Sequence, residues 1–192
     1  MLRRACARGP HARKGAMITR HHLKGDAASS AVYSDCERYR YLLTRVWQPE
    51  GARALFVLLN PSTATEAQND PTVERCERRA RALGFGSFRV TNIFAFRATD
   101  PRAMRAEVDP IGPGNDAAIA ESLGWAAGAQ DRIVCAWGAH GAHLGRGAVV
   151  TELLRASGRP LYHLGLTLAG APRHPLYIGY DRQPELWPGL PG

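Results

Sequence analysis

"LFVLLNPSTATEAQNDPT", residues 55–72, carries an apolar segment directly into a polar loop. The run from Leu55 to Leu59 has no polar break, and this pattern predicts a buried strand over residues 54–59. The residues that follow at once are Asn60, Pro61, Ser62, Thr63 and Thr65. Ligands of open α/β sheets bind just beyond the carboxyl ends of strands, so we expect this loop to form one wall of a site.

The same stretch ends at the start of a predicted helix. Asp70 suits the N-cap position, and Pro71 suits the first helical position. The buried stripe of the helix is expected to consist of Val73, Cys76, Ala80 and Leu83. The outer face is expected to carry Arg75, Arg78 and Arg79, either as a solvated face or as one that contacts phosphate. Asp70 allows two interpretations, a helix cap or a catalytic base.

Apolar segments alternate with helical segments along the rest of the chain. Neighbouring strands are expected at 54–59, 87–94, 132–137 and 160–164, and further helices at 115–126 and 147–158. Residues 31–47 are expected to add one or two strands. This alternation favours an α/β fold, namely a three-layer α/β/α sandwich with a mainly parallel central sheet. One domain is expected to span residues 31–187.

Four polar loops are expected to meet at one edge of this sheet. Right-handed crossovers place the carboxyl ends of parallel strands on the same side. The loops begin at Asn60, after Asn92, at Trp137-Gly138 and at His174-Pro175. Three of them can also be explained without a ligand: Asn60-Pro61-Ser62-Thr63 as a turn, Asn92 as a strand cap and Trp137 as packing.

The positive charge of the chain is concentrated at its amino-terminal end. The chain has 192 residues and a net charge of +8, and residues 1–24 hold seven basic side chains and no acid. We interpret residues 1–24 as a disordered basic arm for an anionic partner, a targeting segment, or the result of a start assigned too early, with Met17 as the true start. The remainder is nearly neutral and has no strong overall attraction to nucleic acid.

Cysteine spacing and hydropathy narrow the class of protein. Cys6, Cys36, Cys76 and Cys135 show no CxxC spacing, so we expect no zinc or iron–sulfur site and no cofactor. His140 and His143 are close in sequence but lack a clear third ligand. Isolated cysteines suit a reducing compartment, which favours a cytoplasmic location. No apolar run approaches about 20 residues, so no membrane span is expected.

Long ordered motifs carry a resemblance to a known family. The segments "YRYLLTRVW", "LNPSTATEAQNDPT", "TNIFAFRATDP", "DPIGPGND", "AWGAHG" and "HPLY" resemble the bacterial and phage domain of unknown function numbered 1643, over roughly residues 31–180. That family has no established activity, so the resemblance implies no reaction.

A more distant resemblance is to the uracil-DNA glycosylase superfamily. Asn60-Pro61 resembles an "NPG" motif whose Asn positions the attacking water, and Asn92 falls where an Asn reads the pyrimidine edge. Trp137-Gly138 resembles a strand-end motif, and His174-Pro175 resembles the motif whose His stabilises the departing base. "HPLY" replaces the usual "HPSP", the iron–sulfur cysteines are absent, and the loop after Asn60 lacks an aromatic side chain for stacking.

The resemblance and the chemistry of the side chains suggest one reaction. Breaking an N-glycosidic bond puts negative charge on the leaving base, to which a neutral His174 can donate a hydrogen bond. Asn60 can orient a water molecule, and Asn92 offers both a donor and an acceptor. The catalytic candidates are thus Asn60 and His174, and the candidates for substrate binding are Pro61, Ser62, Asp70, Asn92, Trp137, Gly138 and Pro175.

The leading hypothesis is therefore a glycosylase-like hydrolase that acts on a pyrimidine, or modified pyrimidine, in nucleic acid. The alternatives are a non-catalytic module that binds a nucleotide or nucleic acid, and an enzyme that acts on free nucleotides or nucleosides. The nearly neutral domain favours a free nucleotide over duplex DNA. The oligomeric state and the substrate base do not follow from the sequence.

Overall fold

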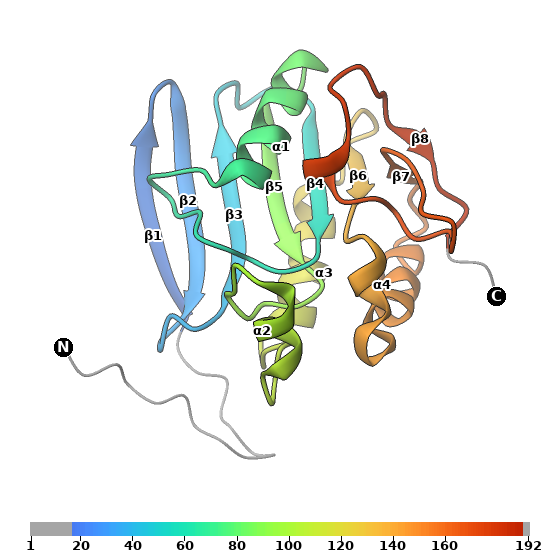
Figure 1. Ribbon diagram of the computed structural model, residues 1–192. Coiled ribbons are helices and arrows are strands. Elements are labelled where there is room, and N and C mark those ends of the chain that lie inside the picture. The colour runs from blue at the N-terminus through green and yellow to red at the C-terminus, as the bar shows by residue number, and fades with distance from the viewer. Residues whose placement is uncertain (1–16, 190–192) are drawn as a thin grey trace.

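A computed structural model describes residues 17–189, which form an α/β fold around one mixed sheet (Figure 1). The strand order within these residues is β1-β2-β3-β5-β4-β6-β7-β8. The strands are β1 (Met17–Lys24), β2 (Ala27–Ser34), β3 (Arg40–Val46), β4 (Arg53–Leu58), β5 (Ser87–Asn92), β6 (Arg132–Cys135), β7 (Leu161–His163) and β8 (Glu185–Leu186). The helices are α1 (Pro71–Ala82), α2 (Pro101–Ala106), α3 (Asn115–Trp125) and α4 (Arg146–Arg155), with 3₁₀ turns η1 (Ala139–Gly145) and η2 (Pro175–Tyr177).

The four strands expected to be parallel neighbours form the centre of the sheet. They lie in the order β5-β4-β6-β7, and each adjacent pair is parallel. In Figure 1 the arrowheads of β4 and β5 point to the lower edge, whereas β3 points the opposite way. The expected loops therefore do leave β4, β5 and β6 at one edge.

The expectation of a mainly parallel sheet is wrong. The pairs β1–β2, β2–β3, β3–β5 and β7–β8 are antiparallel, and they outnumber the three parallel pairs. The reason lies in the hairpin of β1 and β2. Its connection has only two residues, Gly25 and Asp26, with Gly25 at a φ of 62°, and so short a connection can join only antiparallel strands.

Part of the segment expected to be a tail belongs to the sheet. Residues 17–24 form β1, which pairs with β2 from Met17↔Ser34 to Lys24↔Ala27. Most side chains of β1 are exposed, so main-chain hydrogen bonds rather than an apolar pattern hold this edge strand. Within the described residues the sheet thus starts at residue 17, ahead of residue 31, where the domain was expected to begin. Residues 1–16 lie outside the described residues.

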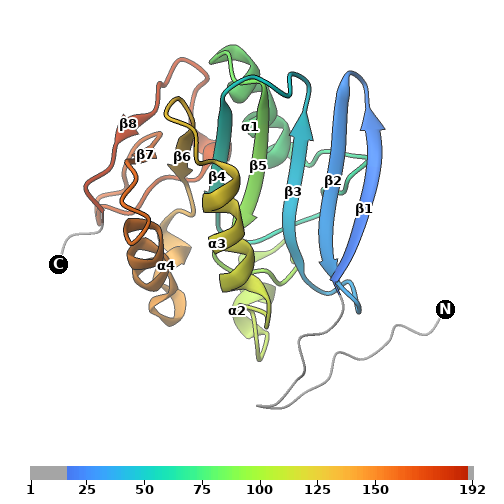
Figure 2. The same cartoon turned by 180° about the vertical axis from the view of Figure 1, so that it is seen from behind.

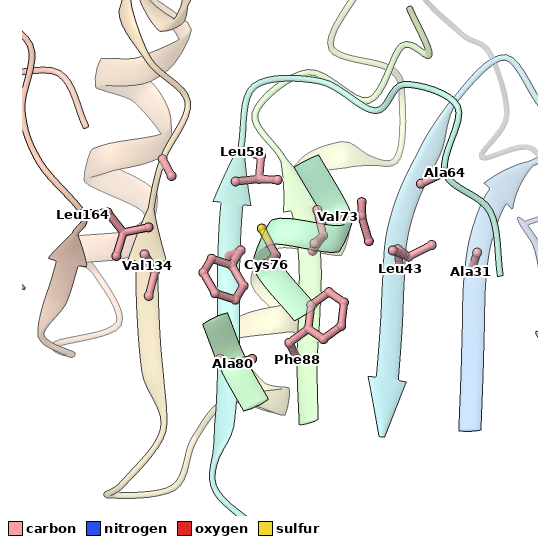
Figure 3. Close-up of a cluster of buried hydrophobic side chains, with 14 of the residues drawn as sticks. Ala31, Leu43, Leu58, Ala64, Val73, Cys76, Ala80, Phe88, Val134 and Leu164 are labelled. Atoms are coloured by element: carbon pink, nitrogen blue, oxygen red, sulfur yellow. The ribbon is translucent and has the colours of Figure 1, made fainter. Parts of the chain in front are cut away.

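Helices cover both faces of the central strands. Figure 3 shows Val73, Cys76 and Ala80 of α1 against one face, which presents Leu58 and Phe88. Seen from behind in Figure 2, α3 crosses the other face. There, Ile119 of α3 and Val150 and Leu154 of α4 join the cluster of Leu55 and Val57. Because β4 is buried on both faces, its sequence is an unbroken apolar run.

The α/β class is confirmed, but a three-layer sandwich across the whole sheet is not. β1 exposes most of its side chains, so no helical layer encloses this edge. The expected helices are present with slightly different ends, and α2 is an additional helix in a segment that we expected to be a loop. Asp100 caps α2 by accepting a hydrogen bond from the Arg102 amide at 2.8 Å. None of the helices within residues 17–189 has the length and apolar character needed to cross a membrane.

Candidate functional site

A cavity of about 500 Å³ lies at the carboxyl ends of the central strands. Its walls come from the loops that follow β4, β5, β6 and β7 and from the first residues of α1. This volume falls within the usual range for sites that hold small organic ligands.

Six of the nine residues predicted for the site line this cavity. They are Asn60, Ser62, Asp70, Trp137, Gly138 and His174. Pro61, Asn92 and Pro175 are not part of the lining. Residues from four distant parts of the sequence are thus brought together, as expected from strands that end at one edge.

The side chain of Asn60 is held in place by two hydrogen bonds that its amide nitrogen donates. Its Nδ2 donates to the carbonyl oxygen of Ala98 at 2.8 Å and to that of Pro61 at 3.0 Å. Carbonyl oxygens only accept hydrogen bonds, so they fix which end of the amide faces them. Oδ1 is left as the acceptor that Asn60 can offer to a water molecule or ligand.

His174 is a neutral imidazole with a defined tautomer. Burial lowers its pKa to about 4, opposed by the negative charge of Asp70 and reinforced by His140. Nδ1 accepts a long hydrogen bond, 3.4 Å, from the Leu176 amide, which places the ring proton on Nε2. His174 can therefore donate from Nε2 at neutral pH without carrying a charge.

Asp70 serves as the cap of α1. Its Oδ1 accepts from the amides of Thr72 and Val73 at 3.0 and 2.9 Å. Its Oδ2 accepts from the Ala64 amide at 3.3 Å. The carboxylate therefore ties the loop after β4 to the helix, which agrees with the first of its two interpretations.

Trp137 and Gly138 shape the wall that follows β6. Trp137 is 1% exposed, and its ring packs edge-on against Trp187 with centroids 5.3 Å apart. Its main role is therefore packing in the hydrophobic core. Gly138 has a φ of 72°, and a Cβ there would lie 3.5 Å from the Cβ of His174. Its amide donates to the Pro172 carbonyl at 2.7 Å, which fixes the His174 loop beside β6.

The two prolines shape loops rather than line the cavity. The Pro61 carbonyl accepts from the Ala98 amide at 2.9 Å as well as from Asn60. Pro175 is buried and begins η2, immediately after His174. Both residues position a neighbouring candidate side chain.

Asn92 lies at the end of β5, paired with Leu58 of β4. It is 1% exposed, and neither Nδ2 nor Oδ1 has a hydrogen-bond partner in the described part of the chain. Burying an amide without partners is costly, so this side chain calls for a water molecule or a ligand group.

Buried arginines hold the cavity loops through main-chain carbonyls. Arg40 donates to Ala64 at 2.6 Å and Arg45 to Thr65 at 2.7 Å, both in the loop that follows Asn60. Burial lowers the pKa of Arg40 to about 10. Both arginines belong to β3, so the antiparallel half of the sheet supports the loop.

The expected outer face of α1 is wrong at Arg79. This side chain is 2% exposed and donates to the carbonyls of Gly179 and Arg182 at 2.8 and 2.5 Å. Arg75 donates to the Ile178 carbonyl at 3.1 Å. Arg78 alone is exposed, in an ion pair with Glu74. The helix thus uses Arg75 and Arg79 to hold the segment that follows His174, not to contact phosphate.

Several residues of the lining were not expected from the sequence. They are Thr72, Thr99, Thr167, Arg173 and Tyr177, together with His140, which had been considered only as a metal ligand. Tyr177 supplies an aromatic ring that the loop after Asn60 lacks, with its centroid 6.1 Å from that of His174. The sequence does contain this aromatic residue, in "HPLY", the motif that begins with the predicted His174.

The two loop histidines do not act as a pair. His140 lines the cavity, whereas His143 packs against Phe94 with ring centroids 5.6 Å apart. Within residues 17–189, no group of three or more His, Cys, Asp or Glu side chains could hold a metal ion.

The model of one protein family matches residues 40–176, more than half of the chain. Its description is "Protein of unknown function (DUF1643)". The chain belongs to this family. The DUF1643 region contains every residue of the cavity lining except Tyr177, which directly follows it. No curated protein and no solved structure matches the chain.

Proposed function

We propose that this DUF1643 protein hydrolyses the N-glycosidic bond of a pyrimidine, or modified pyrimidine, in nucleic acid. One observation carries the proposal: Asn60 and a neutral His174 line the same cavity of about 500 Å³ from loops 114 positions apart in the sequence. Their free atoms are complementary, an acceptor on Asn60 and a donor on His174.

His174 stabilises the leaving group in this mechanism. As the bond breaks, its electron pair moves onto the base and negative charge develops on a ring oxygen. Nε2–H donates to that oxygen, and such oriented donors are among the largest contributors to enzymatic rate. With a pKa of about 4, the imidazole holds its proton as a hydrogen-bond donor rather than as a cation.

Asn60 positions the nucleophile. Nδ2 is occupied by two carbonyls, so Oδ1 is the atom that accepts a hydrogen bond from water. The water oxygen bonds to C1′ of the sugar, and the proton that it loses balances the charge on the departed base. An amide is no base at neutral pH, so its contribution is orientation.

Tyr177 and Asn92 provide the proposed contacts to the base. Tyr177 is 73% exposed at the cavity, where its ring can stack on a pyrimidine. Asn92 has an unpaired donor and acceptor, the combination that an imide edge requires. Because Asn92 is buried and is not part of the lining, reading the base requires neighbouring side chains to move.

A base-release assay tests the proposal. Oligonucleotides that contain uracil, mismatched thymine or modified pyrimidines, single- and double-stranded, are incubated with the protein, and free base is quantified by chromatography. We expect release from at least one substrate, and a loss of about a hundredfold or more in Asn60→Ala and in His174→Ala. His22→Ala, in the exposed strand β1, is the matched control and should keep full activity.

Two results contradict the proposal. Unchanged release in both cavity variants removes their catalytic roles. The absence of release from every substrate, together with nucleotide binding, identifies a non-catalytic binding module instead.

A further inference from the structure

Arg173 is the one lysine or arginine in the cavity lining described above. It is exposed and forms no ion pair with an acidic side chain of residues 17–189. The three arginines of α1 are occupied: Arg75 and Arg79 donate to carbonyls, and Arg78 pairs with Glu74. Arg173 therefore presents at the cavity a guanidinium that no ion pair within the described residues engages.

Two hydrogen bonds fix the backbone around Arg173. The Arg173 amide donates to the Gly165 carbonyl at 2.9 Å, and the preceding Pro172 carbonyl accepts from the Gly138 amide at 2.7 Å. The next residue is His174. The guanidinium is therefore carried by the same rigid loop that places the proposed catalytic donor, which lowers the entropy lost on binding.

Hydroxyl groups from separate loops accompany this cation. Ser62 follows β4, Thr72 begins α1, Thr99 follows β5, and Thr167 follows β7. Hydroxyl donors combined with an arginine are the usual side-chain contacts to phosphate oxygens.

The amino end of α1 cannot bind the anion in place of Arg173. Oδ1 of Asp70 already accepts from the amides of Thr72 and Val73, and its carbonyl accepts from the Glu74 amide at 2.9 Å. Asp70 is also the one carboxylate of the lining, and it repels an anion from that side.

We infer that the ligand of this cavity carries a phosphate group that Arg173 binds, so the substrate is a pyrimidine nucleotide rather than a nucleoside or free base. The inference rests on the proposed function for the identity of the base. The phosphate belongs either to a free nucleotide, as a monoester, or to a strand, as a diester, and Arg173 offers the same two-pronged donor to both.

Calorimetric titration distinguishes these ligands. The probes are deoxyuridine, its 5′-monophosphate, and a short single-stranded oligonucleotide with one central deoxyuridine. The wild-type protein should bind at least one of the two phosphate-containing probes about ten- to hundredfold more tightly than deoxyuridine, the range for a charge-assisted hydrogen bond. The probe with the larger advantage identifies the source of the phosphate.

Variants assign the preference to Arg173. Arg173→Gln should remove the advantage of the phosphate and leave the affinity for deoxyuridine unchanged. Arg132→Gln removes the same charge at the start of β6, the opposite end of the sheet, and should keep the advantage. Equal affinity for all three probes, no binding of any probe, or a preference that survives in Arg173→Gln would overturn the inference.

The titration can contradict this inference without contradicting the proposed hydrolysis, and the reverse also holds. A phosphate preference that depends on Arg173, without release of base, supports this inference and contradicts the proposed reaction. Release of base from an oligonucleotide, together with equal affinity for all three probes, supports the reaction and contradicts this inference.

Discussion

His174 sits where a protonated imidazole would lose much of its hydration. Burial is the main reason that its pKa falls from 6.5 to about 4, and the nearby charge of Asp70 offsets this only in part. A histidine in this state is a hydrogen-bond donor over the whole neutral range. The same physics links the residue to the stability of the fold.

We predict that His174 makes the protein less stable in acid. Between about pH 6.5 and pH 4 the unfolded chain binds a proton at His174 more readily than the folded chain does, so stability falls as the pH falls through this window. Urea unfolding of the wild type and of His174→Gln at pH 7 and at pH 4.5 measures this. On going from pH 7 to pH 4.5, the free energy of unfolding of the variant should rise relative to that of the wild type, by up to the order of 3 kcal/mol. A difference that does not change with pH contradicts the prediction.

Replacing Asn92 should change the stability and the activity of the protein in opposite directions. Replacing its unpaired, buried amide with leucine removes a desolvation penalty, so Asn92→Leu should raise the free energy of unfolding by about 1 kcal/mol or more. The same change should reduce base release, because the proposed reader of the base is lost. Asn115→Leu is the matched control, since its amide donates to the carbonyls of Asn92 and Ile93 and its loss should destabilise. A destabilised Asn92→Leu would show that the amide has partners.

Which side chains meet at the site was only partly predictable. Asn60 and His174 follow apolar strands, and strand order alone brings their loops together. Arg173 and Tyr177 lie on either side of His174 in the sequence, but only the folded loop shows that they also line the cavity: η2 ends at Tyr177, and the Arg173 amide is bonded to the Gly165 carbonyl. Trp137 was ambiguous because a tryptophan at a strand end can pack or stack, and its burial against Trp187 decides between the two.

At the scale of elements, α1 connects two loops of the site. Asp70 ties its first turn to the loop after β4, and Arg79 ties its side to the segment after His174. The helix therefore acts as a rigid spacer between the regions that carry Asn60 and His174.

Two adjacent arginines of α1 should behave very differently. Arg79→Met removes buried hydrogen bonds to Gly179 and Arg182 and leaves their carbonyls without partners, so the free energy of unfolding should fall by about 2–4 kcal/mol. Arg78→Met breaks only an exposed pair with Glu74 and should change stability by less than about 0.5 kcal/mol. Chemical denaturation compares the two, and equal effects would contradict the assignment of Arg79 as a structural residue.

Helices and strands whose apolar residues follow a clear pattern were predictable from the sequence, and elements without such a pattern were not. The capped helix at Pro71 and the buried strand β4 follow from local chemistry. β1 has little apolar pattern because an exposed edge strand depends on main-chain pairing, which the side chains do not reveal. Arg79 was misplaced because its neighbouring segment, residues 178–182, covers that side of α1.

At the scale of the whole molecule, the sheet has a buried parallel centre and exposed antiparallel edges. Hydrogen exchange should reflect this division. Peptides from β4 and β5, whose side chains are almost fully buried, should exchange only through global unfolding. Peptides from β1 should exchange through local opening, faster by orders of magnitude. Mass spectrometry of the exchanging protein measures both, and equal protection of β1 and β4 would contradict the description of β1 as a weakly held edge.

The most direct measurement is a crystal structure with pseudouridine 5′-monophosphate, whose carbon–carbon glycosidic bond resists hydrolysis. We predict that its ring occupies the cavity against Tyr177, with a ring oxygen about 2.6–3.2 Å from Nε2 of His174 and the phosphate at Arg173. A ligand bound outside the cavity, or one whose ring oxygens lie beyond the reach of His174, would contradict the assignment of this cavity as the active site.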